Sequence, residues 1–256
     1  MRYFTNMGWL AEWRRKRVLK RHRIDAALWG AVCRRFGFLA RLSAAQSQKL
    51  QDLSLLFLAE KELVGAHALE VTDAMRVSIA AQACVLVLEL GLDWYGGWSG
   101  VIVYPGDFRV RRSEMDEHGV LHEWDDELAG EAMPGGPVVL SWDAAANDPY
   151  ANVVIHEFAH KLDMVNGEAD GIPPLHPGMD RAAWRRTLAE AYEGFCDAVE
   201  RGTQTWLDPY AAEHPSEFFA VLSEAFFEDP EETCRRYPDF YDQLSRFYRQ
   251  DPRARG

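Results

Sequence analysis

One stretch of the chain carries most of the information about its fold: Val153-Val154-Ile155-His156-Glu157-Phe158-Ala159-His160-Lys161-Leu162-Asp163. As a helix, it is apolar on nearly every side except one. Four residues slightly exceed one helical turn, so His156 and His160 project from the same face and can bind one Zn²⁺. Glu157 points beside such an ion, where it can take a proton from a water molecule whose pKa the metal lowers. The spacing therefore predicts a zinc site on a largely buried helix.

The alternative interpretation is a helix with a histidine pair and a glutamate on its solvated face. The apolar residues on the other sides argue against it, because polar groups buried among them need partners. Asp163 adds support for metal binding, since it follows His160 by three residues and His156 by seven. From that face its carboxylate can accept the ring N–H of a ligating histidine. We therefore favour zinc binding over a solvated polar face.

A catalytic zinc site usually has three protein ligands and leaves one position for water, so one more ligand is needed. His176 lies at the wrong distance to be the third histidine of a metzincin site. The better candidate is a carboxylate on the apolar stretch 215–227, which carries Glu217 and Glu224. The two acids are two helical turns apart and face the same way, although an exposed polar stripe would look the same. Spacing alone does not rank one acid above the other.

Signals elsewhere predict many helices and a few short strands. Ser43 and Gln46 form a capping-box pattern before a helix that runs to Glu60, and residues 73–90 predict a more deeply buried helix. Asp148 and Pro149 predict the start of the motif helix. We expect further helices over residues 180–200, 215–228 and 238–250.

Short β-branched and aromatic runs predict strands over residues 101–104, 108–110 and 137–142. The proline that opens the last run favours an edge strand. Helices outnumber strands, and the strands lie together in the middle of the sequence. This pattern indicates an α+β fold, a mainly helical domain with a small mixed sheet and the motif helix packed beneath it.

Composition narrows the class of protein. The chain has 256 residues, 48% of them hydrophobic, and a formal net charge of −12 at pH 7, which argues against direct nucleic-acid binding. Its longest nearly uncharged apolar run, residues 79–88, is about half the length that a membrane-spanning helix needs. The start of the chain lacks the pattern of a secretory leader, and four widely spaced cysteines fit reduced thiols. We therefore expect a cytoplasmic protein without a transmembrane segment, and we take it to be a monomer.

The charge is unevenly distributed along the chain. Residues 2–23 contain eight Lys or Arg and one acid, Glu12, a local charge of +7 that leaves −19 for the rest. We therefore divide the chain into a basic N-terminal segment, residues 1–24, and one domain, residues 25–256. We expect the basic segment to be a solvated, partly disordered tail that is dispensable for zinc binding. The alternatives are binding to an acidic partner or to an anionic membrane surface.

Several separate segments resemble the Mlc titration factor A family. They are the motif stretch 154–163, the predicted strand 136–142, the run Asp208-Pro209-Tyr210-Ala211-Ala212 and the stretch 217–224. The similarity extends from about Trp29 to Pro252. Members of this family are bacterial zinc-dependent peptidases of the gluzincin type, with a catalytic core similar to that of anthrax lethal factor. The resemblance implies a zincin-like metallopeptidase domain over residues 25–256 that holds one Zn²⁺.

Carried over position by position, the resemblance makes His156, His160 and Glu217 the zinc ligands and Glu157 the general base. Glu224 is then at most a neighbour of the ligands. The resemblance also gives a role to a tyrosine seven residues before the third ligand.

That tyrosine is Tyr210, and its counterpart in such peptidases is placed to stabilise the tetrahedral oxyanion. The alternative is an ordinary packing residue at a helix entry. The resemblance further implies aminopeptidase-like cleavage of short peptides. The strand 137–142 is our candidate for holding the substrate main chain by strand addition.

The family's name indicates a second role, because its members capture the glucose repressor Mlc and would thereby derepress sugar-uptake genes. We expect a zinc-dependent peptidase that acts on peptides or proteins. Binding of a Mlc-type transcriptional repressor is expected either as an additional role or, in the alternative, as the main one. A purely structural zinc site is disfavoured, since such sites usually have four protein ligands and favour cysteine.

Overall fold

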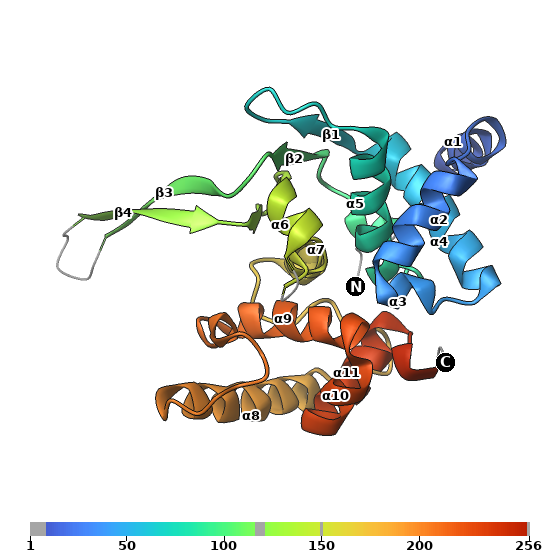
Figure 1. The fold of residues 1–256 in the computed structure, drawn as a ribbon. Coiled ribbons are helices and arrows are strands. Elements are labelled where there is room, and N and C mark those ends of the chain that lie inside the picture. Colours follow the sequence, from blue (N-terminus) through green and yellow to red (C-terminus); the bar gives the residue numbers. More distant parts are fainter. Residues whose placement is uncertain (1–8, 116–120, 149–150, 255–256) are drawn as a thin grey trace.

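A computed structural model describes residues 9–115, 121–148 and 151–254. The ribbon has two stacked parts, with the chain up to residue 163 above and the helices from residue 181 onward below (Figure 1). The upper part contains both sheets, and the lower part is helical in the described residues. The expected α+β class, mainly helical with a small mixed sheet, is confirmed.

Five helices open the upper part: α1 (Trp9–Arg21), α2 (Ala26–Arg35), α3 (Gly37–Ala40), α4 (Ala44–Glu60) and α5 (Asp73–Leu86). The predicted capping box is confirmed, because the Gln46 N–H donates to Ser43 Oγ and the Gln46 side chain accepts the Ser43 N–H. The buried helix α5 ends at Leu86 rather than at residue 90. The chain then turns, and Gly91 takes a φ of 89°, which glycine adopts without strain, before the short 3₁₀ helix η1 (Leu92–Tyr95).

The larger sheet has four strands in the order β1-β2-β6-β5. They are β1 (Glu62–Gly65), β2 (Gly100–Tyr104), β6 (Val138–Ser141) and β5 (Gly130–Ala132). The first three of these run parallel, and β5 is antiparallel to β6. The prediction that residues 137–142 form an edge strand is therefore wrong. All four residues of β6 are buried between two neighbouring strands, and β1 and β5 are the edges of this sheet. Pro137 lies just before β6, so its lack of an N–H does not interrupt the ladder.

A long antiparallel hairpin connects β2 to β5. Its strands are β3 (Phe108–Met115) and β4 (Leu121–Leu128), whereas the sequence predicted a strand only over 108–110. Figure 1 shows the hairpin projecting from the body of the molecule. At its base Phe108 pairs with Leu128, and only residue 129 separates Leu128 from β5. The β3–β4 hairpin therefore continues almost directly into β5.

The motif lies on α7 (Val153–Asp163), which follows the short helix α6 (Trp142–Asn147). Asn152 caps α7, because its side-chain oxygen accepts the Ile155 N–H. Asp148, the predicted cap, instead ends α6, and Pro149 lies outside the described residues. The helix therefore begins later than its Asp-Pro signal indicated.

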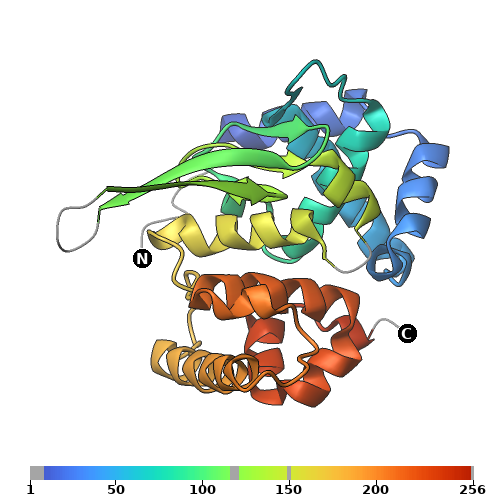
Figure 2. The ribbon, with the colours of Figure 1, turned by 60° about the vertical axis from the view of Figure 1, so that its left-hand side comes forward.

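The lower part consists of α8 (Arg181–Glu200), α9 (Pro215–Glu228), α10 (Pro230–Arg236) and α11 (Pro238–Tyr248). Short 3₁₀ helices, η2 (Met164–Asn166), η3 (Pro209–Ala212) and η4 (Pro252–Ala254), complete the elements. The predicted helices over 180–200 and 215–228 are confirmed, and the one predicted over 238–250 ends two residues earlier. In Figure 2, α9 runs directly beneath α7. Phe218, Phe219, Phe226 and Phe227 of α9 are fully buried. The two stacked parts therefore meet where α7 packs on α9.

The N-terminal segment is more regular than the sequence predicted. Residues 9–21 form α1, whose Arg15 pairs with Glu60 at 2.6 Å and with Asp93 at 2.9 Å. Val18 and Leu19 pack partly buried against the core. The expectation of a solvated, partly disordered tail is therefore wrong for these residues. None of the helices in the described part of the chain is long and apolar enough to cross a membrane.

Two buried lysines flank the ring of Trp98. Lys61 Nζ lies 3.9 Å and Lys161 Nζ 4.9 Å from the ring centroid, and each ammonium also donates to two backbone carbonyls. Burial lowers the pKa of each lysine to about 8. The carbonyls and the aromatic face partly replace the water that these ammonium groups lose.

This environment predicts a pH dependence of stability. The folded pKa of Lys61 is about 8 and its ordinary value is 10.5, so the unfolded chain binds more protons between those pH values. The free energy of unfolding contributed by this group should then rise from pH 8 to 10. We expect the wild type to gain stability relative to Lys61→Met over this interval, as measured by urea unfolding at each pH. Parallel pH curves for the two proteins would contradict the assignment.

Candidate metal centre

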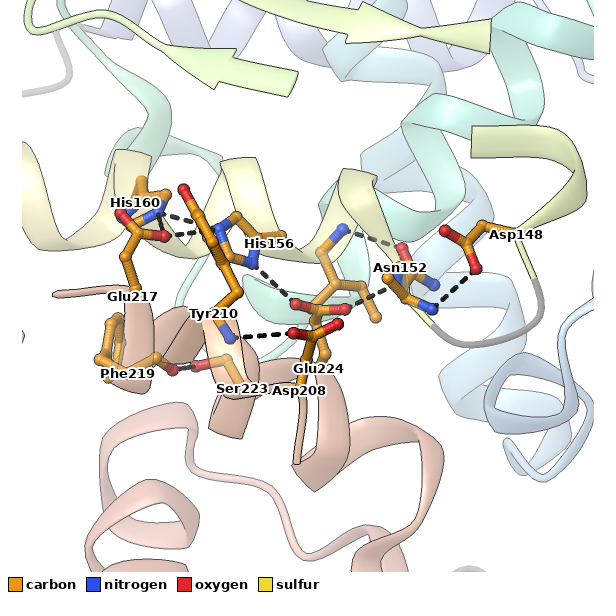
Figure 3. Close-up of polar contacts among 12 residues, drawn as sticks. Asp148, Asn152, His156, His160, Asp208, Tyr210, Glu217, Phe219, Ser223 and Glu224 are labelled. Carbon is orange, nitrogen blue, oxygen red and sulfur yellow. Dashed lines mark hydrogen bonds and ion pairs between the residues drawn. The ribbon is translucent and has the colours of Figure 1, made fainter. Parts of the chain in front are cut away.

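The two histidines of α7 point toward α9. His156 and His160 are one turn apart on the helix, and their ring centroids are 4.8 Å apart (Figure 3). Their Nε2 atoms approach to 3.1 Å. The remainder of α7 is buried in the core, with Ile155, Phe158 and Leu162 fully covered. Burial of the apolar sides thus sets the orientation of the helix, and the two histidines point toward the lower part of the molecule.

Glu217 completes the group from the first turn of α9. Its Oε2 lies 3.0 Å from His156 Nε2 and 3.2 Å from His160 Nε2. The three atoms therefore form a nearly equilateral triangle. Two imidazole nitrogens and one carboxylate oxygen at these separations suit a single ion with bonds of about 2.0 to 2.2 Å. The group could hold a metal ion.

The charges of this group are strongly coupled. Burial disfavours the charged form of His156, but the carboxylates of Glu217 and Glu224 outweigh burial and raise its pKa well above its ordinary value. Burial likewise opposes ionisation of Glu217, and the two histidines overcome it and lower the pKa of that carboxyl. The carboxylates and imidazoles therefore stabilise one another's charged forms.

Glu224 occupies a different position from Glu217. Its Oε1 accepts from His156 Nδ1 at 2.7 Å, and its Oε2 accepts the Asn152 N–H at 2.6 Å. A proton held on Nδ1 by this carboxylate leaves the lone pair of His156 Nε2 free to bind a metal. The structure therefore gives different positions to the two acids that residue spacing did not rank. One meets both histidines at Nε2, and the other orients one histidine from behind.

Asp163 does not make the contact that the sequence predicted. Its Oδ2 accepts the Gly171 N–H at 2.7 Å, and burial raises its pKa to about 7. Its Oδ1 and His160 Nδ1 are both buried and have no hydrogen-bond partner. Residue spacing put Asp163 on the correct face. The chain after η2 folds back, however, and the Gly171 N–H donates to this carboxylate in place of a histidine ring.

Glu157 lies between the metal group and the edge strand β5. It is 5% exposed, and burial raises its pKa, an effect that the neighbouring histidines partly oppose. Gly130 of β5 passes so close that an added Cβ would lie 2.5 Å from Glu157 Oε1 and 2.7 Å from Val153 Cγ2. A glycine at this point lets the strand approach the carboxylate, which no sequence signal had indicated.

We expect Gly130→Ala to destabilise the protein by about 1–3 kcal/mol, because a methyl group there must displace Glu157, Val153 or the strand. Urea unfolding measures this loss. Gly106→Ala is the matched control, since a Cβ at Gly106 meets no atom within 4 Å. Equal stability of the two variants would show that the close approach of β5 is not maintained.

Tyr210, a residue of η3, lies beside the two histidines of α7. Its ring centroid is 6.1 Å from that of His156, and the residue is 42% exposed. The Asp208 side chain accepts the Tyr210 N–H at 2.9 Å and so caps η3 (Figure 3). The structure thus brings the phenol to the open side of the histidine pair.

Three contacts around the site were missed from the sequence. Lys161 donates to the carbonyls of Met133 and Gly136 and so ties the turn between β5 and β6 to α7. Asn152 links the cap of α7 to Glu228 at 2.9 Å. Gly130 is the third. A buried lysine next to the motif and an Asn three residues before Ile155 were the available signals, but their partners lie far away in the sequence.

Comparison with known proteins finds a matching family model and similar relatives. A family model described as glucose-regulated metallo-peptidase M90 matches residues 10–249. An uncharacterized protein of Synechocystis sp. is 37% identical over 251 residues, which cover 95% of this chain and 90% of the relative. The Mlc titration factor A of Klebsiella pneumoniae is 38% identical over 222 residues, covering 85% and 84%. That of Edwardsiella ictaluri is 38% identical over 240 residues, 90% of each chain. The resemblance to Mlc titration factor A is thereby confirmed, and the chain belongs to the glucose-regulated metallo-peptidase M90 family.

Proposed function

We propose that this protein is a zinc-dependent peptidase. The observation that supports it most strongly is the triangle of His156 Nε2, His160 Nε2 and Glu217 Oε2, with a buried carboxylate, Glu157, beside it. Two imidazoles and one carboxylate are the donor set of a catalytic rather than a structural zinc site. Membership of a metallo-peptidase family supports the same activity.

In this proposal each residue has a definite task. His156, His160 and Glu217 hold the ion, which when bound polarises the scissile carbonyl and acidifies a water molecule. Glu157 accepts the proton of the attacking water on its carboxylate and returns it to the departing amine. The Tyr210 hydroxyl donates a hydrogen bond to the oxyanion.

The substrate main chain would pair with β5. This strand is one of the two edges of the sheet, and its Gly130 lies against Glu157, so a peptide added alongside it would pass close to the proposed base. We propose short peptides as substrates and aminopeptidase-like cleavage, which rests on the resemblance alone.

The experiment starts with metal analysis of the purified protein. A panel of chromogenic peptides, including aminoacyl anilides, should be hydrolysed by the zinc-loaded protein and not after treatment with a chelator. Re-addition of Zn²⁺ should restore turnover. Zinc-replete protein that cleaves none of these peptides would remove the aminopeptidase-like specificity.

A second candidate function is regulatory binding. The name Mlc titration factor A of two relatives supports binding of a Mlc-type repressor. We propose a cytoplasmic location for this binding. Binding and hydrolysis can coexist in one chain. A pull-down with purified repressor of the same organism tests it directly, and absence of binding at micromolar concentrations would remove this role.

A further inference from the structure

A second concave surface lies at the end of the molecule away from α8 to α11, where α1 packs against α4 (Figures 1 and 2). We call it the α1 groove. It has a volume of about 730 Å³, and Trp13, Arg14, Arg17 and Arg21 of α1 line one side. Glu60 and Asp93 lie on the other side. None of the residues proposed for the metal centre lines this groove.

The positive charge of the groove is not neutralised by its own acids. Glu60 and Asp93 both pair with Arg15. Within the described ranges, no carboxylate lies within ion-pair distance of Arg14, Arg17 or Arg21, and all three are exposed. They follow one another at i, i+3 and i+7, which is one face of a helix. The result is a straight stripe of guanidinium groups about 10 Å long.

Trp13 adds an aromatic contact at the side of this stripe. It is 51% exposed, and the guanidinium of Arg17 lies 5.4 Å from its ring centroid. Tryptophan and arginine are the residue types that most often dominate binding energy at protein interfaces. Outside residues 2–23 the chain carries a formal charge of −19, so the cationic charge of the groove contrasts with an acidic remainder.

We propose that the α1 groove binds an acidic, extended peptide segment of a partner protein. A row of arginines along one helix matches a row of carboxylates, whereas a compact phosphate needs guanidinium groups that converge on one point. A hollow surface receives a peptide, whereas a flat membrane surface is met by an amphipathic helix lying in its plane. Residues 1–8 contain no Asp or Glu, so they do not supply the missing charge.

The test uses a fluorescein-labelled decapeptide of alternating glutamate and serine, with glutamine in place of glutamate as the uncharged probe. Fluorescence anisotropy with the full-length protein should show saturable binding of the acidic peptide that weakens with salt. Binding of the glutamine peptide should be undetectable. Equal affinity for the two peptides would overturn the proposal.

A matched pair of variants separates the groove from general electrostatics. Arg14→Glu/Arg17→Glu changes two groove residues, and Lys16→Glu/Lys20→Glu makes the same change in charge at two exposed positions of α1 outside the groove. We expect the first double variant to lower the affinity for the acidic peptide by about tenfold or more, and the second by less than about twofold. Trp13→Ala should also lower this affinity, although it changes no charge. Equal losses in the two double variants would show an effect of net charge alone and refute the site.

Other occupants are distinguished in the same series. Vesicles of phosphatidylglycerol that bind through Arg14 and Arg17 while the peptide does not would identify a membrane surface and overturn the proposal. A dimer that is lost in Arg14→Glu/Arg17→Glu, with no peptide binding, would identify a second copy and overturn it as well. Circular dichroism and thermal unfolding equal to those of the wild type show that each variant is folded.

Discussion

Turnover of a peptide substrate should fall by about 10²- to 10⁴-fold in Glu157→Gln, while the metal stays bound. Glutamine keeps the size and hydrogen-bonding reach of the buried side chain, so its fit against Gly130 is retained. It lacks the carboxylate that accepts the proton of water. The three proposed ligands are unchanged, so the deficit should appear in kcat more than in KM. Steady-state kinetics and metal analysis of the same preparation measure both.

Glu190→Gln is the control for this substitution, since Glu190 lies exposed on α8. It should leave turnover and metal content as in the wild type. Binding of a repressor, if present, should persist in Glu157→Gln. Near-normal turnover in metal-replete Glu157→Gln would mean that this glutamate is not the base, and regulatory binding would then be the better account of the protein.

Zinc affinity should fall far more in Glu217→Ala than in Glu224→Ala. Glu217 Oε2 faces both histidine Nε2 atoms, so alanine removes one of the three proposed ligands. Glu224 meets only the far nitrogen of His156. Loss of such an outer partner typically costs 10- to 100-fold in metal affinity, and we expect the loss in Glu217→Ala to exceed about 100-fold. Competition with a chromophoric chelator measures both dissociation constants.

Each acid also needs a check on folding, because Glu224 holds the Asn152 N–H at the start of α7. Glu224→Gln keeps one acceptor oxygen there and should lie between the wild type and Glu224→Ala in affinity. Thermal unfolding of the metal-free proteins reports any structural loss separately. Equal affinities for Glu217→Ala and Glu224→Ala, both folded, would exclude Glu217 as the third ligand.

Features that depend on near neighbours in the chain were predictable from the amino-acid sequence. The four-residue spacing of His156 and His160 puts both rings on one face of any helix, whatever surrounds it. The capping box at Ser43 and the proline that opens α9 act within one helical turn. The mixed α+β character followed from such local signals and is confirmed.

Residue spacing did not distinguish Glu217 from Glu224; the resemblance assigned the ligand role to Glu217, and tertiary packing supplies the physical reason. Periodicity shows that both acids lie on one face of α9. It does not show which turn of α9 lies opposite which turn of α7. Packing of α9 beneath α7 sets this offset and puts one acid at the Nε2 atoms and the other behind His156. Asp163 illustrates the same limit, because a backbone N–H brought in by a later loop replaced its expected partner.

The edge of the sheet, the approach of β5 to Glu157 and the order of α1 were also decided only by the folded chain. Strand order is a property of long-range pairing, and β6 became central because β5 came back along it from the far hairpin. Helix α1 was not apparent from its composition because Arg15 finds its two acids on other elements. Local sequence sets which faces and caps exist. Which faces meet is decided by contacts between residues far apart in the chain, and those contacts have no local signal.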